Sequence, residues 1–337
     1  MNRHFRNLIL GAGAGLLLVA LAMPALRAQP SPSLAIARNF TAPTPPATQP
    51  VYRLVPLFRT PDEVRARAQQ AGLTPASLAT MKTVGALNTV RDANWTFHLD
   101  TDRQMETLMD NAVIAGRYGR SLLVPSEASC RQAALHFLGR RKLVAGSDDE
   151  ELVYERTNEM IRGYRGVADK GPAAPPVVVL REVVFTKALG GVRCTGQGTR
   201  FSVFVGDGGR VMGYLANWMP AVATTDRAAV ATVDTTLGRL STDIVARDNG
   251  IGETQSRAAS AAVRGCRYVL TTQPDRNGGL VTVPAFEYRG QVTDRRRRSG
   301  EFSRVVPALR EANSLDHLLL VPAADTLERV PAARRGR

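Results

Sequence analysis

Histidine and cysteine are scarce in this chain, which has only four His and three Cys among its 337 residues. The sequence contains no His-x-x-x-His, His-Glu-x-x-His or Cys-x-x-Cys spacing. Such spacings place two ligands on the same side of a metal ion, as zinc sites in proteins require. The sequence therefore predicts no metal centre, and it indicates no cofactor.

Catalytic motifs are lacking as well. No Gly-x-Ser-x-Gly motif, which presents a nucleophilic serine in many hydrolases, is present. Gly206-Asp207-Gly208-Gly209 has the glycine content of a phosphate-binding loop, but no Lys-Ser or Lys-Thr follows it. Its position between two expected strands favours a hairpin turn. Because the members of a catalytic triad need not be close in sequence, an uncharacterised hydrolase is kept as an alternative.

The first 28 residues contain the long hydrophobic run that the rest of the chain lacks. Leu8–Met23 has 16 residues and no charge, Arg3 and Arg6 precede it, and Ala28 follows it. This is the layout of a secretory signal peptide. A spanning helix needs about 20 residues, so an uncleaved membrane anchor is the alternative, and the absence of a Cys after the run argues against a lipid anchor. We expect a periplasmic or extracellular protein after cleavage near Ala28.

Lysine is rare too, with four Lys among the 44 basic residues, and the formal net charge is +14. Codon usage in a GC-rich genome is one explanation of the arginine bias. The other is attraction to an acidic polymer or a membrane surface; nucleic acid is the least expected partner of an exported protein. Arg295–Arg298 is the densest basic run, and it is a solvated loop, a site sensitive to proteolytic processing, or the anchor for such a partner.

The clearest structural signal is Val177–Pro220, which predicts a series of antiparallel strands. Val177–Phe185 is rich in β-branched residues, and Gly190-Gly191 interrupts it. Arg200–Val205 then alternates, with Phe201, Val203 and Val205 on one side, and a glycine-rich turn leads into Val211–Trp218. The segment is predicted to form the sheet around which the rest of the chain is organised.

Helices are expected on either side of these strands. Thr60 and Glu63 form a capping box, so a helix is predicted from there to Ala71. A second helix is expected to begin at Ser126, and a third is expected over Thr254–Arg264. The inward face of the second helix is predicted to be Cys130, Ala134, Leu135 and Leu138. Helices alternating with antiparallel strands favour an α+β fold in which helices pack on antiparallel sheets.

Three cysteines in an oxidising compartment allow one disulfide with one thiol left over. Cys194 lies beside the strand series and Cys266 lies in a later strand-like segment, so this is the pair that we favour. Cys130 lies on the apolar face of a predicted helix and is expected to be a buried thiol.

Four turn residues and a tryptophan follow one another along the strand series: Gly191, Gly196, Asp207, Gly208 and Trp218. Their order resembles that of the PepSY-like and FTP-like modules, which occur in propeptides of secreted thermolysin-type metalloproteases and in many exported bacterial proteins. Val281–Gly290 resembles the closing strand of the same family. Val192 stands where the family often has proline, and no protease domain follows.

The resemblance implies two to three helix-plus-hairpin units that bind a partner and do not catalyse a reaction. Trp218 is a binding candidate if it is exposed on the outer face of the sheet, and otherwise it is a core aromatic residue. The chain is then divided into a signal peptide (1–28), a Pro-rich linker (29–50), PepSY-like units (51–120 and 121–225), a third partial unit (226–292) and a basic flexible tail (293–337).

We therefore expect an exported, non-catalytic protein that binds a peptide or protein partner by pairing with an exposed strand edge, as an inhibitor or chaperone of a secreted enzyme. The alternative is a protein that binds an acidic polymer or the envelope surface through Arg295, Arg296, Arg297 and Arg298. Salt distinguishes the two, because the Debye length falls from about 10 Å at 0.1 M to about 3 Å at 1 M.

Overall fold

The computed structural model describes residues 34–116, 123–144, 149–162, 177–250, 258–294, 297, 299–310, 315, 318 and 319. The predicted signal peptide lies outside these residues. In this part of the chain, no helix is both long enough and apolar enough to cross a membrane.

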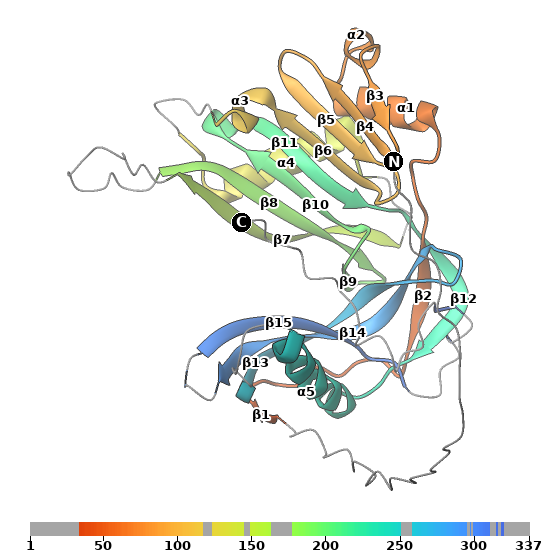
Figure 1. The fold of residues 1–337 in the computed structure, drawn as a ribbon, viewed down its shortest axis with the longest axis vertical. Helices are drawn as coiled ribbons and strands as arrows, with labels where there is room; N and C mark the ends of the chain where they lie inside the picture. Colours follow the sequence, from red (N-terminus) through yellow and green to blue (C-terminus); the bar gives the residue numbers. More distant parts are fainter. Residues whose placement is uncertain are drawn as a thin grey trace, which may run out of the picture. The chain divides into compact units, whose positions relative to one another are not determined.

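Strands dominate the structure, and the described residues form a 15-stranded sheet (Figure 1). In chain order the strands are β1 (Ala35–Arg38), β2 (Thr48–Leu54), β3 (Lys82–Val84), β4 (Leu87–Arg91), β5 (Trp95–Asp100), β6 (Met105–Asp110), β7 (Glu150–Arg162), β8 (Val177–Leu189), β9 (Val192–Thr195), β10 (Thr199–Val205), β11 (Val211–Trp218), β12 (Ala221–Ala229), β13 (Ala258–Pro274), β14 (Leu280–Asp294) and β15 (Ser299–Pro307).

The described helices are α1 (Pro61–Ala71), α2 (Pro75–Leu78), α3 (Asn111–Ile114), α4 (Glu127–Arg141) and α5 (Val233–Gly250), with a 3-10 turn, η1 (Asp207–Gly209). The predicted capping box is confirmed. The Glu63 N–H donates to Thr60 Oγ1 at 3.3 Å, and the Thr60 N–H donates to Glu63 Oε2 at 2.8 Å. Helix α1 ends at Gly72 in the left-handed conformation (φ +105°), which a glycine adopts without steric cost.

The sheet has two regions that β9 joins. The strand order is β12-β2-β14-β13-β9-β8-β10-β11-β6-β5-β4-β3, with β1 paired to β13, β15 to β14 and β7 to β8. We call β1, β2 and β12–β15 region A, and β3–β8, β10 and β11 region B. Strand β9 pairs in parallel with β13 and antiparallel with β8. This four-residue strand therefore connects the two regions through backbone hydrogen bonds.

The predicted α+β class, with helix-plus-hairpin units, is wrong because strands of different predicted units also pair with one another and form one large sheet. Strand β6 pairs with β11, so that Leu108 lies opposite Tyr214, and β2 pairs with both β12 and β14. A period-two hydrophobic pattern identifies a strand without identifying its partner. The same sequence pattern is therefore compatible with several small sheets and with one large β-rich sheet, and the structure has the latter.

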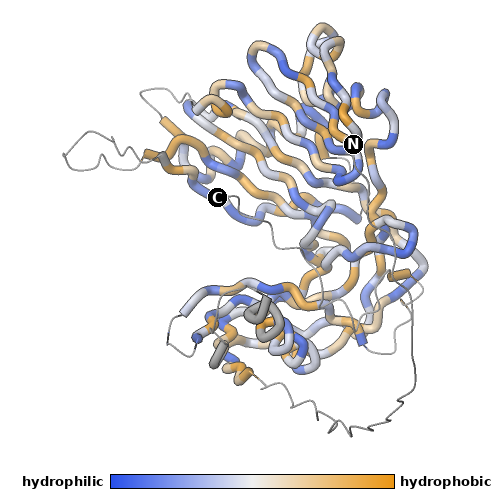
Figure 2. The backbone as a smooth tube through the Cα atoms, in the orientation of Figure 1, coloured by the Kyte–Doolittle hydropathy of each residue, from blue (hydrophilic) through white to orange (hydrophobic). Residues whose placement is uncertain are grey.

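In region B, α1 and α4 bury their apolar stripes against one face of the sheet. Phe185, Phe201 and Phe97 are fully buried in this core, and each contributes about 1.5–3 kcal/mol by leaving water. Figure 2 shows the hydrophobic stretches along these strands. Helix α4 contributes Cys130, Ala134 and Leu138 as predicted, but Leu135 is 41% exposed, so its predicted inward orientation is wrong.

In region A, α5 packs against β13, β14 and β15 through Leu237 and Leu240, which meet Phe286 and Tyr288. The predicted helix over Thr254–Arg264 is wrong, because β13 begins at Ala258. This small-residue segment lies between two partners, β1 in parallel and β14 antiparallel. The backbone hydrogen bonds of those ladders outweigh the weak local preference of Ala and Ser for helix.

Two segments predicted to be flexible contain strands. Residues 35–38 and 48–50 fall in the predicted Pro-rich linker, yet they belong to β1 and β2. Residues 299–307 fall in the predicted tail, yet they form β15, whose register along β14 runs from Thr293↔Ser299 to Ala285↔Pro307. The partners of β1 and β2 are far along the chain, so no local pattern indicates them, whereas β15 pairs with β14, the strand that precedes it.

A buried lysine occupies the junction of the two regions. Lys187 is 0% exposed; its Nζ contacts the Glu150 carboxylate, donates to the carbonyl oxygen of Met219 at 2.7 Å, and lies 4.4 Å from the centroid of the Trp218 ring. The Ala221 N–H donates to the same Glu150 carboxylate at 2.9 Å. Burial lowers the pKa of Lys187 to about 7, while the adjacent Glu150 carboxylate favours the ammonium form.

The predicted disulfide between Cys194 and Cys266 does not form in the structure, where both are free thiols, as is Cys130. Cys194 lies opposite Leu270 in the β9–β13 ladder, four residues along β13 from Cys266. At about 3.3 Å per residue the two Cα atoms are about 13 Å apart, whereas a disulfide requires less than about 7 Å. Burial raises the pKa of Cys194 to about 12 and that of Cys266 to about 11.

Replacing Lys187 with Met should lower the free energy of unfolding by about 3–5 kcal/mol, because the Glu150 carboxylate then stays buried without its compensating cation. Urea denaturation followed by circular dichroism measures the loss. The double variant Lys187→Met/Glu150→Leu should recover much of it, since both charges are then absent. A single variant within 1 kcal/mol of the parent protein would show that the ion pair does not matter for stability.

The thiols should resist alkylation in the folded protein, because they are at least half-buried and burial disfavours the reactive thiolate. Iodoacetamide at pH 7.4 is expected to modify none of Cys130, Cys194 and Cys266 in the native state, and all three once the protein is unfolded in guanidinium without reductant. Intact-mass spectrometry counts the adducts. A single adduct on the unfolded chain would instead reveal a disulfide.

Candidate functional site

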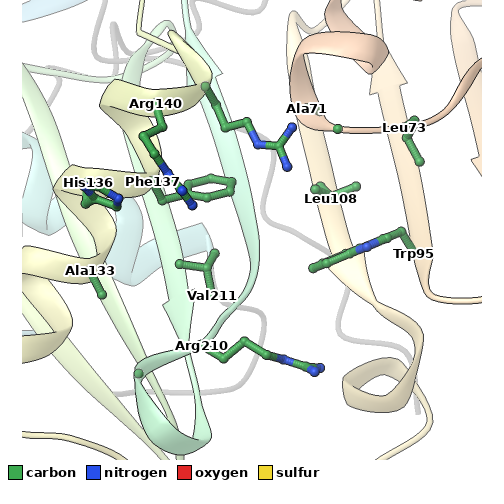
Figure 3. A pocket seen from close by; sticks show the side chains of 13 residues that line it. Ala71, Leu73, Trp95, Leu108, Ala133, His136, Phe137, Arg140, Arg210 and Val211 are labelled. Carbon is green, nitrogen blue, oxygen red and sulfur yellow. The ribbon is translucent and has the colours of Figure 1, made fainter.

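The described residues enclose a cleft of about 390 Å³ that lies between α4, the C-terminal end of α1 and strands β5, β6 and β11 (Figure 3). This volume is within the range of ligand-binding pockets. Its apolar lining is formed by Ala71, Leu73, Trp95, Leu108, Ala133, Phe137 and Val211. Its polar lining side chains are His136, Arg140, Arg141 and Arg210, so we call it the arginine cleft.

Helix α4 presents one stripe of side chains to the arginine cleft. Ala133, His136, Phe137 and Arg140 follow one another at i, i+3, i+4 and i+7, which is the spacing of a single helix face. Phe137 is half-buried and its ring lies 5.9 Å from that of Tyr214 in β11. The helix therefore holds an aromatic residue against the sheet and an exposed guanidinium next to it.

Arg141 reaches from the end of α4 to the end of α1. A Cβ atom at Gly72 would lie 2.7 Å from Arg141 Nη1, so the guanidinium lies directly against the glycine. Gly72 is the C-cap of α1 and Lys142 is the C-cap of α4. Carbonyl groups at a helix C-terminus carry partial negative charge and favour a cation, which accounts for an arginine at this place.

Arg210 contributes the third guanidinium from a different element. It follows η1 directly, its side chain is 64% exposed, and one of its terminal nitrogens forms an ion pair with Asp110. Asp110 is already engaged, because its Oδ1 accepts a hydrogen bond from the Ala112 N–H at 2.8 Å as the N-cap of α3. Its negative charge is therefore shared between Arg210 and the helix.

The described part of the protein places no carboxylate against two of the cleft's arginines, Arg140 and Arg141. Within these residues, no carboxylate lies within 4.0 Å of the guanidinium groups of Arg140 or Arg141. Two adjacent arginines are hydrated and repel each other when no anion is present. The cleft thus offers positive charge beside an apolar surface.

A buried hydrogen-bond network links the elements that surround this cleft. Arg67 of α1 donates from Nε to Glu106 Oε2 at 2.7 Å and from Nη2 to the carbonyl oxygen of Leu143 at 2.9 Å. The hydroxyl of Tyr214 donates to the other oxygen of Glu106. Burial raises the pKa of Glu106, which the Arg67 guanidinium opposes, and burial beside Glu106 raises the pKa of Tyr214. The network connects α1, β6, β11 and the chain after α4.

The side chains that line the arginine cleft are mainly guanidinium groups, aromatic rings and aliphatic groups. Among the described residues that line it, none is a Ser, Cys, Asp or Glu, and His136 contributes an imidazole. In the same part of the chain, no cluster of three His, Cys, Asp or Glu side chains has the arrangement of a metal site.

The residues singled out from sequence are not gathered into one site. Trp218 is 3% exposed and packs beneath Lys187, so it is a core residue and unavailable to a partner. The turn residues Gly191, Gly196 and Gly208 have φ values of +76°, +102° and +62° at separate turns. Asp207 accepts a hydrogen bond from the Leu123 N–H at 2.7 Å. Of the four-arginine run, Arg297 is described and exposed; Arg295, Arg296 and Arg298 lie outside the described residues.

The strand edge predicted to receive a peptide is not available either. Strand β8 lies between β7 and β10, and β11 lies between β10 and β6. Both sides of these central strands of the Val177–Trp218 segment are therefore occupied by other strands, and pairing with a partner strand there is excluded.

Sequence reasoning missed the arginine cleft because its parts come from segments that are distant in the chain. One signal was available in α4, where Ala133, His136, Phe137 and Arg140 form a second stripe beside the core stripe. Arg140 and Arg141 also stand at a helix C-terminus, where their charge has a local explanation. Nothing in the sequence indicated that Trp95 or Arg210 would face this stripe.

No protein-family model and no curated protein matches the chain. Twelve solved chains match its fold; one is an uncharacterised protein from Eubacterium rectale, which is 7% identical with a TM-score of 0.47 over 85% of this chain and 91% of that chain. The resemblance to PepSY-like modules is overturned by the 15-stranded sheet. Those modules are small α+β units, and the short glycine turns that suggested them occur in any antiparallel sheet.

Proposed function

We propose that this protein is a non-catalytic binding protein that takes an acidic segment of a peptide or protein partner into the arginine cleft. The observation that carries the proposal is the position of Arg140 and Arg141 beside the apolar surface of Phe137 and Trp95. Guanidinium groups bind carboxylates through paired hydrogen bonds. Aromatic side chains supply the buried contact area that dominates many protein interfaces.

Rigidity of the site supports this function. The Arg67 network holds the elements around the cleft in place before any ligand arrives, so little ordering of the protein is required on binding. The absence of nucleophiles and carboxylates from the described lining favours recognition over hydrolysis. Export, and a role as inhibitor or chaperone of a secreted enzyme, belong to the same proposal.

A second function is favoured by charge alone. The net charge of +14 and the exposed Arg297 next to the end of β14 suit an acidic polymer or an anionic envelope surface. Binding of that kind requires no apolar contact and weakens steeply with salt. Binding in the arginine cleft is partly apolar and should persist in part at 1 M salt.

Removing the two arginines should weaken the binding of a simple probe, the capped peptide acetyl-Gly-Glu-Phe-Gly-amide. We expect Arg140→Ala/Arg141→Ala to weaken its affinity at least tenfold, about 1.4 kcal/mol, with little change in melting temperature because both side chains are exposed. The readout is the change in tryptophan fluorescence when the peptide binds. This change should be lost in the Trp95→Phe variant, because Trp95 is the tryptophan that lines the cleft.

Arg65→Ala is the matched control, because it removes an exposed arginine of α1 that pairs with Asp62 outside the cleft. The same peptide with Gln in place of Glu tests whether binding requires the carboxylate. Equal weakening by Arg65→Ala, or complete loss of binding at 1 M salt, would favour the charge-driven function. No binding of any acidic peptide would refute the cleft as the site.

A further inference from the structure

The arginine cleft has positive charge at two separate ends. Figure 3 shows Arg140 at one end and Arg210 at the other, with Phe137 and Val211 between them. The two arginines come from different elements, α4 and the start of β11. A ligand with one carboxylate can occupy one end and leaves the other end without a ligand group.

The end formed by Arg210 is fixed in position. Its backbone N–H donates to the carbonyl oxygen of Asp207 at 3.2 Å, and its carbonyl oxygen accepts from the Gly206 N–H at 2.9 Å. Its Nε lies 3.3 Å from the sulfur of Met212, and one terminal nitrogen holds Asp110. The guanidinium is therefore directed by several contacts, yet most of it is open to solvent.

Asp110 offsets part of the positive charge at this end and leaves one side of the Arg210 guanidinium exposed. Its carboxylate is only 10% exposed and also caps α3, so its charge offsets part of that of Arg210. A second carboxylate arriving from the cleft can bind the exposed side of the guanidinium, because arginine has five donors and Asp110 uses one side of the fork.

We infer that the arginine cleft selects a segment in which two carboxylates flank an apolar or aromatic side chain. One carboxylate pairs with Arg140 and Arg141, the apolar side chain lies against Phe137 and Val211, and the second carboxylate pairs with Arg210. This inference rests on the proposed function and adds the class of peptide that it recognises. Two fixed charges with an apolar surface between them give specificity for spacing, which one charge cannot give.

The experiment is a series of capped peptides in which two Glu are separated by one, two, three or four residues including a Phe, compared with the one-Glu peptide and with a peptide that has two adjacent Glu. We expect one spacing to bind at least tenfold more tightly than the one-Glu peptide at 0.15 M salt. Affinity that depends on the number of Glu and not on spacing overturns the inference.

Variants of the arginines show which end of the cleft binds each carboxylate of the peptide. Arg210→Ala should remove the gain of the best-spaced peptide over the one-Glu peptide, whereas Arg140→Ala/Arg141→Ala should weaken the binding of both peptides. Asp110→Asn keeps a side chain that caps α3 and removes the competing charge, so it should tighten the best-spaced peptide about threefold, since the pair with Arg210 is partly exposed.

These outcomes separate the inference from the function on which it rests. If the one-Glu peptide binds and no spacing binds better, the two-ended recognition is wrong and the proposed function stands. If no acidic peptide binds the parent protein, the proposed function fails as well. If Arg210→Ala weakens the one-Glu peptide as much as the best-spaced one, the ends do not act separately and the inference fails.

Discussion

The buried guanidinium of Arg67 holds together the elements that surround the arginine cleft. It bonds to Glu106 in β6, to Gln70 in its own helix and to the carbonyl oxygen of Leu143 after α4. Through Glu106 it also reaches Tyr214 in β11. An uncompensated charge at this depth costs several kcal/mol, so the helices and strands can move apart only if the whole network breaks.

The positive charge of the cleft follows from this arrangement. Helices α1 and α4 bring their C-terminal ends together, since Gln70 donates to the carbonyl oxygen of Lys142 at 2.5 Å and Arg141 lies over Gly72. Cations stabilise such ends. Arginines that stabilise these helix ends can also bind an anion, because their terminal nitrogens are exposed beside an apolar surface.

A different constraint operates at the junction of the two sheet regions. Strand β9 has only four residues, and a fully buried Lys187 lies beside it with its ammonium enclosed by Glu150, the Met219 carbonyl and the Trp218 ring. Such an arrangement is stable only when every charge and donor is matched. The junction therefore favours this way of joining the regions, because the buried lysine finds a carboxylate, a carbonyl oxygen and an aromatic ring here.

The sequence by itself determined the local structure of this protein. The capping box of Thr60 and Glu63, the start of α4 at Ser126 and the strands after Val177 depend on hydrogen bonds and side-chain patterns within a few residues. Only the tertiary structure decided the partners of each strand, the strand identity of Ala258–Pro274 and the placement of Arg140 and Arg210 in one cleft. These depend on contacts between residues far apart in the chain, and periodicity carries no information about such contacts.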